Sequence, residues 1–526
     1  MKHWNSLIAV SVLSLALSAC SSTSQPNDPL IYGLTLAPSG IDPHINASSE
    51  LGIPLSSVYD TLIFQDPDSG AFVPGLAETW SISDDGLTYT FHLRQDVIFH
   101  DGTSLNADAV KFNIDYTINP ENHSQKAAFM LGPLREVEVI DEYTIAFHLN
   151  QPYAPLLDSL AQVYLGIASP EALEAWGPVD YQFHQVGTGP YRFVEYVPND
   201  HILLERNPDY AWAPSIYNQS QPSIEQIQFK FYEDPATRSF ALETGEVDIM
   251  GEIPPREAER LDADDRFNLY PISIPGQPLQ FFLNTARAPT DDLLVRQALI
   301  IGVDRPQVIE TVFGSRSPLA QAPVSAVTLG YTSAIPFPAY DPQAAASLLE
   351  QAGWELSMQD GLRHQGQRIL ELQIVAPPWG SNPDVAQLLA AAWRQLGAQV
   401  ELQIAPGFGP LKEAQSAGEY HAIGINFFGQ DPDLLYSFYH SQELYNWSQI
   451  PNPELDSLLE QARRETLDTE LRNQLYAEAF EIIRDQALLL PMRDYTNLVI
   501  ARQDLEGLQY STQGWFPFLI DLQWMP

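Results

Sequence analysis

Residues 385–404 read VAQLLAAAWRQLGAQVELQI, and this stretch decides the class of fold. Residues 385–396 are rich in helix-forming side chains, and Gly397 is the kind of residue that commonly ends a helix. From Val400 to Ile404 apolar and polar side chains then alternate, as they do in a strand with one buried face. A helix, a glycine and a strand in this order are typical of an α/β lobe.

The sequence on both sides of this stretch shows similar signals for the beginning and the end of helices. Residues 341–353 begin with Asp-Pro, which suits the first turn of a helix, and end in a glycine that closes it. Thr290 is expected to cap a further helix whose first turn is acidic. Long helices are predicted at 453–465 and 468–488. The C-terminal half is therefore predicted to be α/β.

The first third of the chain has a different character. Residues 88–93 alternate in polarity like a half-buried strand, and 137–139 with 145–149 flank a polar turn as a hairpin does. This region is predicted to be α+β.

Composition excludes one large class of partner. The 526 residues include 67 acidic and only 26 basic side chains, a formal net charge of -41. Such a surface repels the phosphates of nucleic acids, so no nucleic-acid partner is expected. With 45% apolar residues the chain has ample material for a large core.

The sole cysteine closes an N-terminal targeting signal. An apolar run over 7–17, too short for the roughly 20 residues that span a bilayer, leads into Leu17-Ser18-Ala19-Cys20. This lipobox predicts a signal peptide at 1–19, with a lipidated Cys20 and a flexible tether at 20–29. The protein is thus expected outside the cytoplasm, anchored to the membrane by lipid.

Signatures of catalysis are missing. The sequence holds no G-x-S-x-G, S-x-x-K, H-E-x-x-H, P-loop or G-x-G-x-x-G pattern, and its histidines show no metal-ligand spacing. His100-Asp101 precedes a glycine and is interpreted as a strand end before a turn. We expect no catalytic residue, no cofactor and no metal ligand, although a surface-anchored hydrolase remains a remote alternative.

A series of short blocks, in order along nearly the whole chain, resembles the bacterial extracellular solute-binding proteins of family 5, which include oligopeptide-, dipeptide- and nickel-binding receptors. The blocks are PGLAETW at 74–80, DGLTYTF at 85–91, FHDGT at 99–103, VGTGPY at 186–191, ERNPDY at 205–210, ETGEVDI at 243–249, LNT at 283–285 and VRQAL at 295–299.

The resemblance implies a periplasmic-binding-protein-like α/β fold of type II, in its large cluster C form, with two α/β lobes joined by a hinge and an extra α+β domain. The implied ranges are 30–55, 180–275 and 491–526 for lobe I, 56–179 for lobe II and 276–490 for lobe III. It further implies a monomer that takes up a peptide or peptide-like solute between lobes I and III and delivers it to an ABC permease and its ATPase.

The resemblance also suggests ligand contacts. In peptide-binding members a tryptophan stacks on the ligand and an aspartate pairs with its amino group; Phe408 falls at the tryptophan position, and Gln430 falls where the aspartate would be, with Asp431 beside it. Because a neutral amide binds an ammonium less strongly than a carboxylate does, a non-peptide solute such as an oligosaccharide, an opine-like conjugate or a chelated metal stays open. The remaining candidate ligand contacts are Phe427, Phe428, Trp379, His44 and Asn46.

Overall fold

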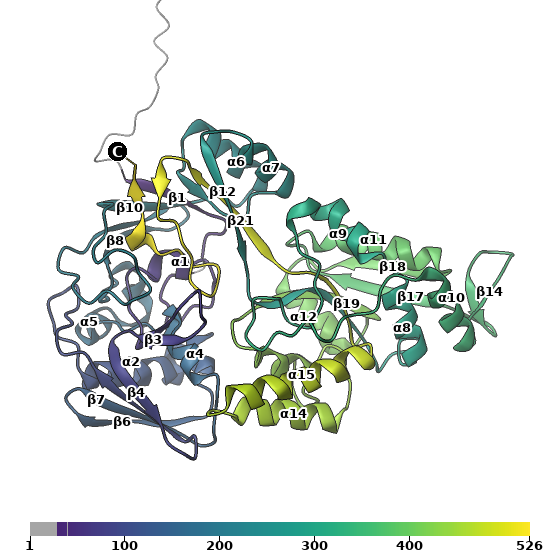
Figure 1. Ribbon diagram of the computed structural model, residues 1–526, viewed down its shortest axis with the longest axis horizontal. Helices are drawn as coiled ribbons and strands as arrows, with labels where there is room; N and C mark the ends of the chain where they lie inside the picture. Colours follow the sequence, from purple (N-terminus) through teal and green to yellow (C-terminus); the bar gives the residue numbers. More distant parts are fainter. Residues whose placement is uncertain (1–28, 39, 526) are drawn as a thin grey trace, which may run out of the picture.

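The computed structural model describes residues 29–38 and 40–525, so the predicted signal peptide and Cys20 lie outside the described residues. Three large sheets organise the chain, and we name a lobe after each. Lobe I, at the upper left of Figure 1, holds a seven-stranded sheet in the order β12-β21-β11-β1-β10-β9-β8. Its strands are β1 (Leu30–Leu34), β8 (Tyr191–Val197), β9 (His201–Arg206), β10 (Gln226–Phe231), β11 (Ile249–Met250), β12 (Phe267–Ser273) and β21 (Thr496–Arg502). Helices α6 (Pro235–Thr244) and α7 (Pro255–Asp262) pack on this sheet.

Lobe II lies below lobe I in Figure 1 and contains a four-stranded antiparallel sheet, β4-β5-β7-β6. The predicted hairpin at 137–149 is confirmed as β6 and β7, which pair across a two-residue turn. The elements of this lobe are β4 (Ala77–Ile82), β5 (Thr88–Leu93), β6 (Leu134–Asp141), β7 (Thr144–Leu149), α2 (Ala107–Ile118), α4 (Leu156–Leu160) and α5 (Pro170–Asp180). Lobes I and II share one continuous apolar core.

Lobe III has a five-stranded sheet in the order β18-β17-β19-β13-β20, with an apolar core on each face. Its strands are β13 (Gly276–Leu283), β17 (Glu371–Ala376), β18 (Gln399–Ile404), β19 (Ala422–Phe428) and β20 (Leu489–Arg493). One face is covered by α8 (Leu293–Ile301), α9 (Arg305–Phe313), α10 (Pro342–Gln351) and α11 (Asn382–Gln395). The other is covered by α12 (Phe408–Ala417), α13 (Leu434–Tyr439), α14 (Pro453–Arg464) and α15 (Thr469–Asp485).

The stretch that predicted the fold class forms α11 and β18, as expected. Trp393 of α11 is completely buried and its Nε1 donates to the Leu299 carbonyl of α8 at 2.9 Å, which ties the two helices together. The predicted cap at Thr290 is wrong. The cap of α8 is Asp292, whose Oδ1 accepts from the Leu294 N–H at 2.8 Å, because the Thr290 hydroxyl is engaged by the Arg287 carbonyl.

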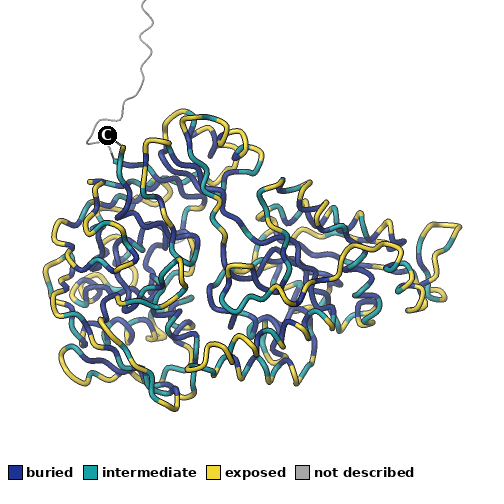
Figure 2. The backbone as a smooth tube through the Cα atoms, viewed as in Figure 1, coloured by how far each residue is buried: buried dark blue, intermediate teal, exposed yellow. Residues whose placement is uncertain are grey.

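The chain crosses between lobes I and III twice. One crossing joins β12 to β13 and the other joins β20 to β21, and the Ile274 N–H donates to the Tyr495 carbonyl at 2.9 Å where they run side by side. Both crossings are largely buried (Figure 2). Lobes II and III also touch each other, since the Ala154 N–H donates to the Arg463 carbonyl at 2.9 Å.

Among the described residues, no helix combines the length and the apolarity that crossing a lipid bilayer requires.

Candidate ligand-binding cleft

The sheet of lobe III presents one edge to the hinge. Strands β17, β18 and β19 run parallel, and β20 runs the same way because it and β19 both pair antiparallel with β13. Their carboxyl ends, at Ala376, Ile404, Phe428 and Arg493, therefore lie along the same edge. In open α/β sheets this edge is where ligands bind.

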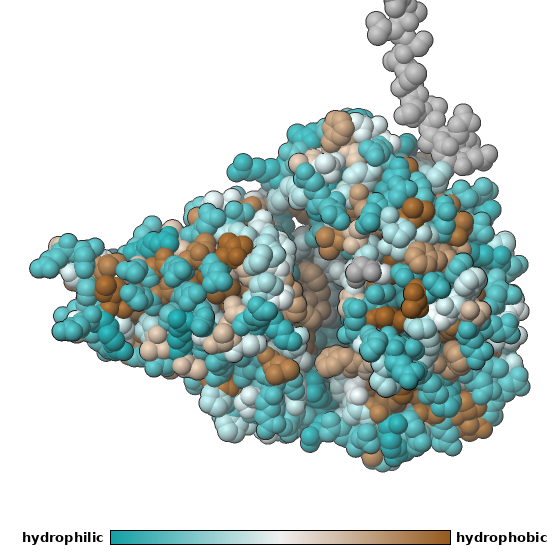
Figure 3. All heavy atoms as spheres, turned by 180° about the vertical axis from the view of Figure 1, so that it is seen from behind, coloured by the Kyte–Doolittle hydropathy of each residue, from teal (hydrophilic) through white to brown (hydrophobic). Residues whose placement is uncertain are grey.

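The sheet of lobe I also presents one edge to the hinge, from the side opposite lobe III. Strands β1, β10 and β11 are parallel, so the residues that follow Leu34, Phe231 and Met250 share an edge, and β21 starts from that edge because it pairs antiparallel with β11. Both crossings leave from these two edges, which places the edges on either side of the hinge. Figure 3 shows, from behind, the groove that separates the halves.

Three aromatic rings from different parts of the chain meet at the hinge. Phe428 ends β19, Tyr495 lies in a crossing, and Trp515 comes from the C-terminal return to lobe I. The ring centroids are 5.1 Å apart for Phe428 and Tyr495, 5.2 Å for Phe428 and Trp515, and 5.7 Å for Tyr495 and Trp515. Contacts of this kind are favourable for aromatic pairs. Because the three rings come from lobe III, a crossing and lobe I, we interpret them as an apolar floor at the hinge end of the cleft.

Lobe I adds acidic groups beside this floor. The Tyr495 hydroxyl donates to Glu252 Oε1 at 2.5 Å. Glu252 adopts a left-handed backbone conformation, with φ of 47°, and is held there by a 2.7 Å hydrogen bond from its N–H to Asn497 Oδ1. Glu50 is buried and accepts from the Thr35 hydroxyl at 2.7 Å. Burial, together with the charge of Glu252, raises the pKa of Glu50 to about 7.

Several predicted contacts gather on the carboxyl edge of lobe III. Trp379 follows β17 and is partly buried against the lobe III core, and Phe408 is the first residue of α12 and 42% exposed. Phe427 and Phe428 end β19 but face differently: Phe427 is 44% exposed and its ring lies 5.4 Å from Phe438, whereas Phe428 joins the aromatic floor.

The two candidates for an amino-group anchor have different surroundings. Gln430 is 4% exposed, and its buried Oε1 has no hydrogen-bond partner among the described residues. Asp431 is fully engaged, since both of its carboxylate oxygens accept from Arg472. The structure therefore argues against Asp431 as an anchor for a ligand.

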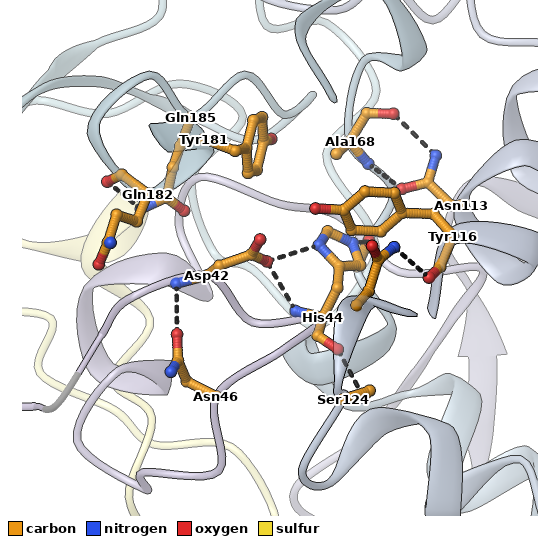
Figure 4. A network of polar contacts seen from close by, with 12 residues as sticks. Asp42, His44, Asn46, Asn113, Tyr116, Ser124, Ala168, Tyr181, Gln182 and Gln185 are labelled. Carbon is orange, nitrogen blue, oxygen red and sulfur yellow. Dashed lines mark hydrogen bonds and ion pairs between the residues drawn. The ribbon is translucent and has the colours of Figure 1, made fainter. Parts of the chain in front are cut away.

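The His44 ring is held by protein atoms in this conformation, whereas Asn46 is half-buried and stays a predicted ligand contact (Figure 4). His44 is 1% exposed; its Nδ1 lies 3.0 Å from Asp42 Oδ1 and its Nε2 lies 2.9 Å from the Gly166 carbonyl oxygen of lobe II. Asn46 Oδ1 accepts from the Asp42 N–H at 3.1 Å. Both ring nitrogens of His44 are engaged, so His44 joins lobe I to lobe II in this conformation and is not free to contact a ligand.

The His100-Asp101 pair is also structural. His100 Nε2 lies 2.9 Å from the Gly189 carbonyl oxygen, Asp101 Oδ2 accepts from the Ser169 hydroxyl at 2.5 Å, and burial lowers the pKa of His100 to about 4. Within residues 29–38 and 40–525, no three His, Cys, Asp or Glu side chains are grouped so that they could hold a metal ion.

Sequence reasoning missed four residues at the hinge end of the cleft. A signal for two of them was present, because MRDY at 492–495 places a charged pair and a tyrosine between two apolar strands. No local pattern pointed to the other two, which reach the hinge only through the tertiary fold. The missed residues are Arg493, Tyr495, Glu252 and Trp515.

The family model of the bacterial extracellular solute-binding proteins, family 5 (middle region), matches residues 71–449. The chain belongs to this family. Its members bind solutes for ABC importers outside the cytoplasm and are not enzymes, and the two-lobed α/β architecture with an added α+β lobe is the fold of its structural relatives. The predicted family and fold class are thereby confirmed.

Relatives of similar closeness bind different solutes. The dipeptide-binding protein of Escherichia coli is 28% identical over 94% of this chain and 95% of its own length. The nickel-binding periplasmic protein of the same organism is 28% identical over 90% of each chain. The crystal structure of NikA from Brucella suis in complex with Fe(III)-EDTA superposes with a TM-score of 0.83 at 26% identity, covering 95% of this chain and 100% of that one. The ligand must therefore be argued from the cleft itself.

Proposed function

We propose that this protein captures a peptide or peptide-like solute between lobes I and III and hands it to an ABC permease with its ATPase. The observation that carries the proposal is the cleft between two carboxyl edges, with aromatic side chains on lobe III and the acidic Glu50 and Glu252 on lobe I. Aromatic walls accept varied side chains, and carboxylates suit an amino group. Closure about the two crossings would bury the solute.

Titration calorimetry of the purified mature protein with di- to pentapeptides tests this function. We expect binding of at least one length class, accompanied by a smaller radius of gyration in solution X-ray scattering as the lobes close. Absence of heat and of compaction across the whole set would remove the peptide assignment.

One observation favours a second candidate, a non-peptide solute. The position expected to hold an amino-group anchor carries the neutral Gln430, and the neighbouring Asp431 is occupied by Arg472. An oligosaccharide, an opine-like conjugate or a chelated metal would need no such anchor. Mass spectrometry of the solute that co-purifies from the native host distinguishes these candidates from a peptide.

Membrane attachment is proposed through lipid on Cys20, preceded by a signal peptide at 1–19 and followed by a tether to residue 29. We expect the wild-type protein, acting as a monomer, to partition with membranes, and Cys20→Ala to be released from them. Equal membrane retention of both proteins after a high-salt wash would exclude the lipid anchor.

A further inference from the structure

Arg493 is an exception among the deeply buried arginines of the described chain. It is 6% exposed, its Nε has no acceptor, and its guanidinium is in no ion pair with any described residue. Arg296 and Arg305 are buried to a similar degree, but each donates to main-chain carbonyls: Arg296 to Gln486, Thr290 and Asp291, and Arg305 to Ala320 and Pro491.

Burying a guanidinium without a partner is costly. Loss of hydration disfavours the charged form, and burial accordingly lowers the pKa of Arg493. The guanidinium carbon of Arg493 lies 4.0 Å from the ring centroid of Phe313 and 4.6 Å from that of Tyr495. A cation–π contact stabilises a guanidinium less than a paired carboxylate does and accepts no N–H hydrogen bond in its plane, so the rings do not replace an anion.

Neither nearby carboxylate supplies that anion. Glu252 receives the Tyr495 hydroxyl, and Asp494 Oδ2 accepts from the Ala326 N–H at 3.1 Å. Neither acid forms an ion pair with Arg493, and Glu252 Oε2 lies 3.9 Å from Arg238 Nη1 instead.

A second unpaired donor lies against the same tyrosine. Trp515 Nε1 is buried without an acceptor among the described residues, and the Trp515 ring lies 5.7 Å from Tyr495. Guanidinium and indole groups only donate hydrogen bonds. The partner that both lack is therefore an acceptor, and beside a guanidinium it is an anion.

The position of this pair connects it with the cleft. Arg493 is the last residue of β20, on the carboxyl edge of lobe III, and Trp515 belongs to the aromatic floor at the hinge. An anion that reached both donors from either side of Tyr495 would touch lobe III and lobe I at once. We propose that Arg493, assisted by Trp515 Nε1, binds a carboxylate of the solute. The inference rests on the proposed solute-binding function and names the charge that the solute must carry.

Paired peptides test the anion site. Each peptide that binds is titrated as the free C-terminal acid and as the C-terminal amide, against wild type, Arg493→Gln and Arg493→Lys. We expect the acid to bind wild type at least 30-fold more tightly than the amide, Arg493→Gln to bind both alike, and Arg493→Lys to recover part of the preference. Equal affinities for acid and amide in wild type, or a preference that survives Arg493→Gln, overturn the inference.

A second set of probes separates this inference from the peptide proposal. Thermal unfolding is measured with small mono- and dicarboxylates and with their neutral amides. If no peptide binds but a carboxylate raises the melting temperature of wild type and not of Arg493→Gln, the peptide assignment fails and the anion site stands. If no carboxylate in either set binds, or if carboxylates stabilise both proteins equally, the anion site fails.

Stability without solute distinguishes a binding arginine from a structural one. Arg493→Gln removes a buried unpaired charge and is expected to raise the melting temperature of the solute-free protein. Arg296→Gln, the matched control, breaks hydrogen bonds to the Gln486 carbonyl and is expected to lower it. A large drop in melting temperature for Arg493→Gln counts against the inference.

Discussion

Asp431 and Arg472 form a bidentate ion pair, with Oδ1 2.6 Å from Nη2 and Oδ2 2.8 Å from Nη1. The side chains are 9% and 12% exposed. A second pair, Asp433 with Arg463, lies beside it, and Arg463 receives the Ala154 N–H through its carbonyl oxygen. The acid after Gln430 thus belongs to the seam between lobes II and III.

Replacing Asp431 with asparagine is expected to weaken folding rather than binding. The variant leaves Arg472 buried with one of its two charge-assisted bonds lost, which costs about 3–5 kcal/mol. Urea unfolding should show this loss, while calorimetry on the folded variant should give a solute affinity within about threefold of wild type. Asp264→Asn, which changes an exposed ion pair with Arg266, is the control and should change little. A tenfold loss of affinity at unchanged stability would show that Asp431 faces the solute.

His44 is likewise predicted to contribute to the stability of the fold and not to solute binding. His44→Ala removes two buried hydrogen-bonding ring nitrogens and leaves a cavity where lobe I meets lobe II, so we expect a loss of about 2–4 kcal/mol in the free energy of unfolding. Binding by the folded protein should persist. His123→Ala, on a turn of lobe II, serves as the control. A variant that folds with wild-type stability but no longer binds solute contradicts this assignment.

The fold was predictable from the local sequence because helix ends and the alternation of a strand depend on residues that are neighbours in the chain. Residues 385–404 show this, since their glycine and their alternation correspond to the end of α11 and to β18. The limit of lobe III was harder to place. The predicted range stops at 490, within β20, whereas β20 continues its pairing to Arg493.

The site was less predictable because its parts are joined only by tertiary contacts. Phe428 and Trp515 are far apart in sequence, and nothing local to either indicates that their rings lie 5.2 Å apart. Resemblance could suggest Gln430 and Asp431 by position, but the partner that occupies Asp431 comes from a helix that starts at Thr469. Which polar side chains of a cleft are free to bind a ligand depends on partners like Arg472, which the local sequence does not reveal.

Phe428 is predicted to matter more for binding than its neighbour. Phe428→Ala removes the ring that links lobe III to Tyr495 and Trp515, and we expect solute affinity to fall at least tenfold. Phe240→Ala, on an exposed ring of lobe I, is the control and should bind as wild type does. Phe427→Ala should have a smaller effect, because that ring rests on Phe438 instead. The reverse order of effects for Phe427 and Phe428 would refute the arrangement of the floor.

Asp158 gives the seam between lobes II and III a pH dependence. Its Oδ2 accepts from Gln162 Nε2 at 2.8 Å, and its Oδ1 is buried with no hydrogen-bond partner among the residues that the structure describes. Burial first, and the charge of Asp431 second, raise the pKa of Asp158 to about 7, against the opposing charges of Arg472 and Lys126.

The raised pKa fixes the sign of the effect. An unfolded aspartate has a pKa of about 3.9, so between about pH 4 and pH 7 the folded protein holds a proton that the unfolded chain releases. The stability that this proton contributes is complete below pH 4 and is lost as the pH rises through 7. Asp158→Asn keeps a neutral group at every pH. Relative to wild type it should therefore gain about 2–4 kcal/mol between pH 5 and pH 8, measured by urea unfolding, whereas Asp84→Asn on an exposed turn should show no such trend. A constant difference between Asp158→Asn and wild type across this range would mean that Asp158 is already ionised in the folded protein.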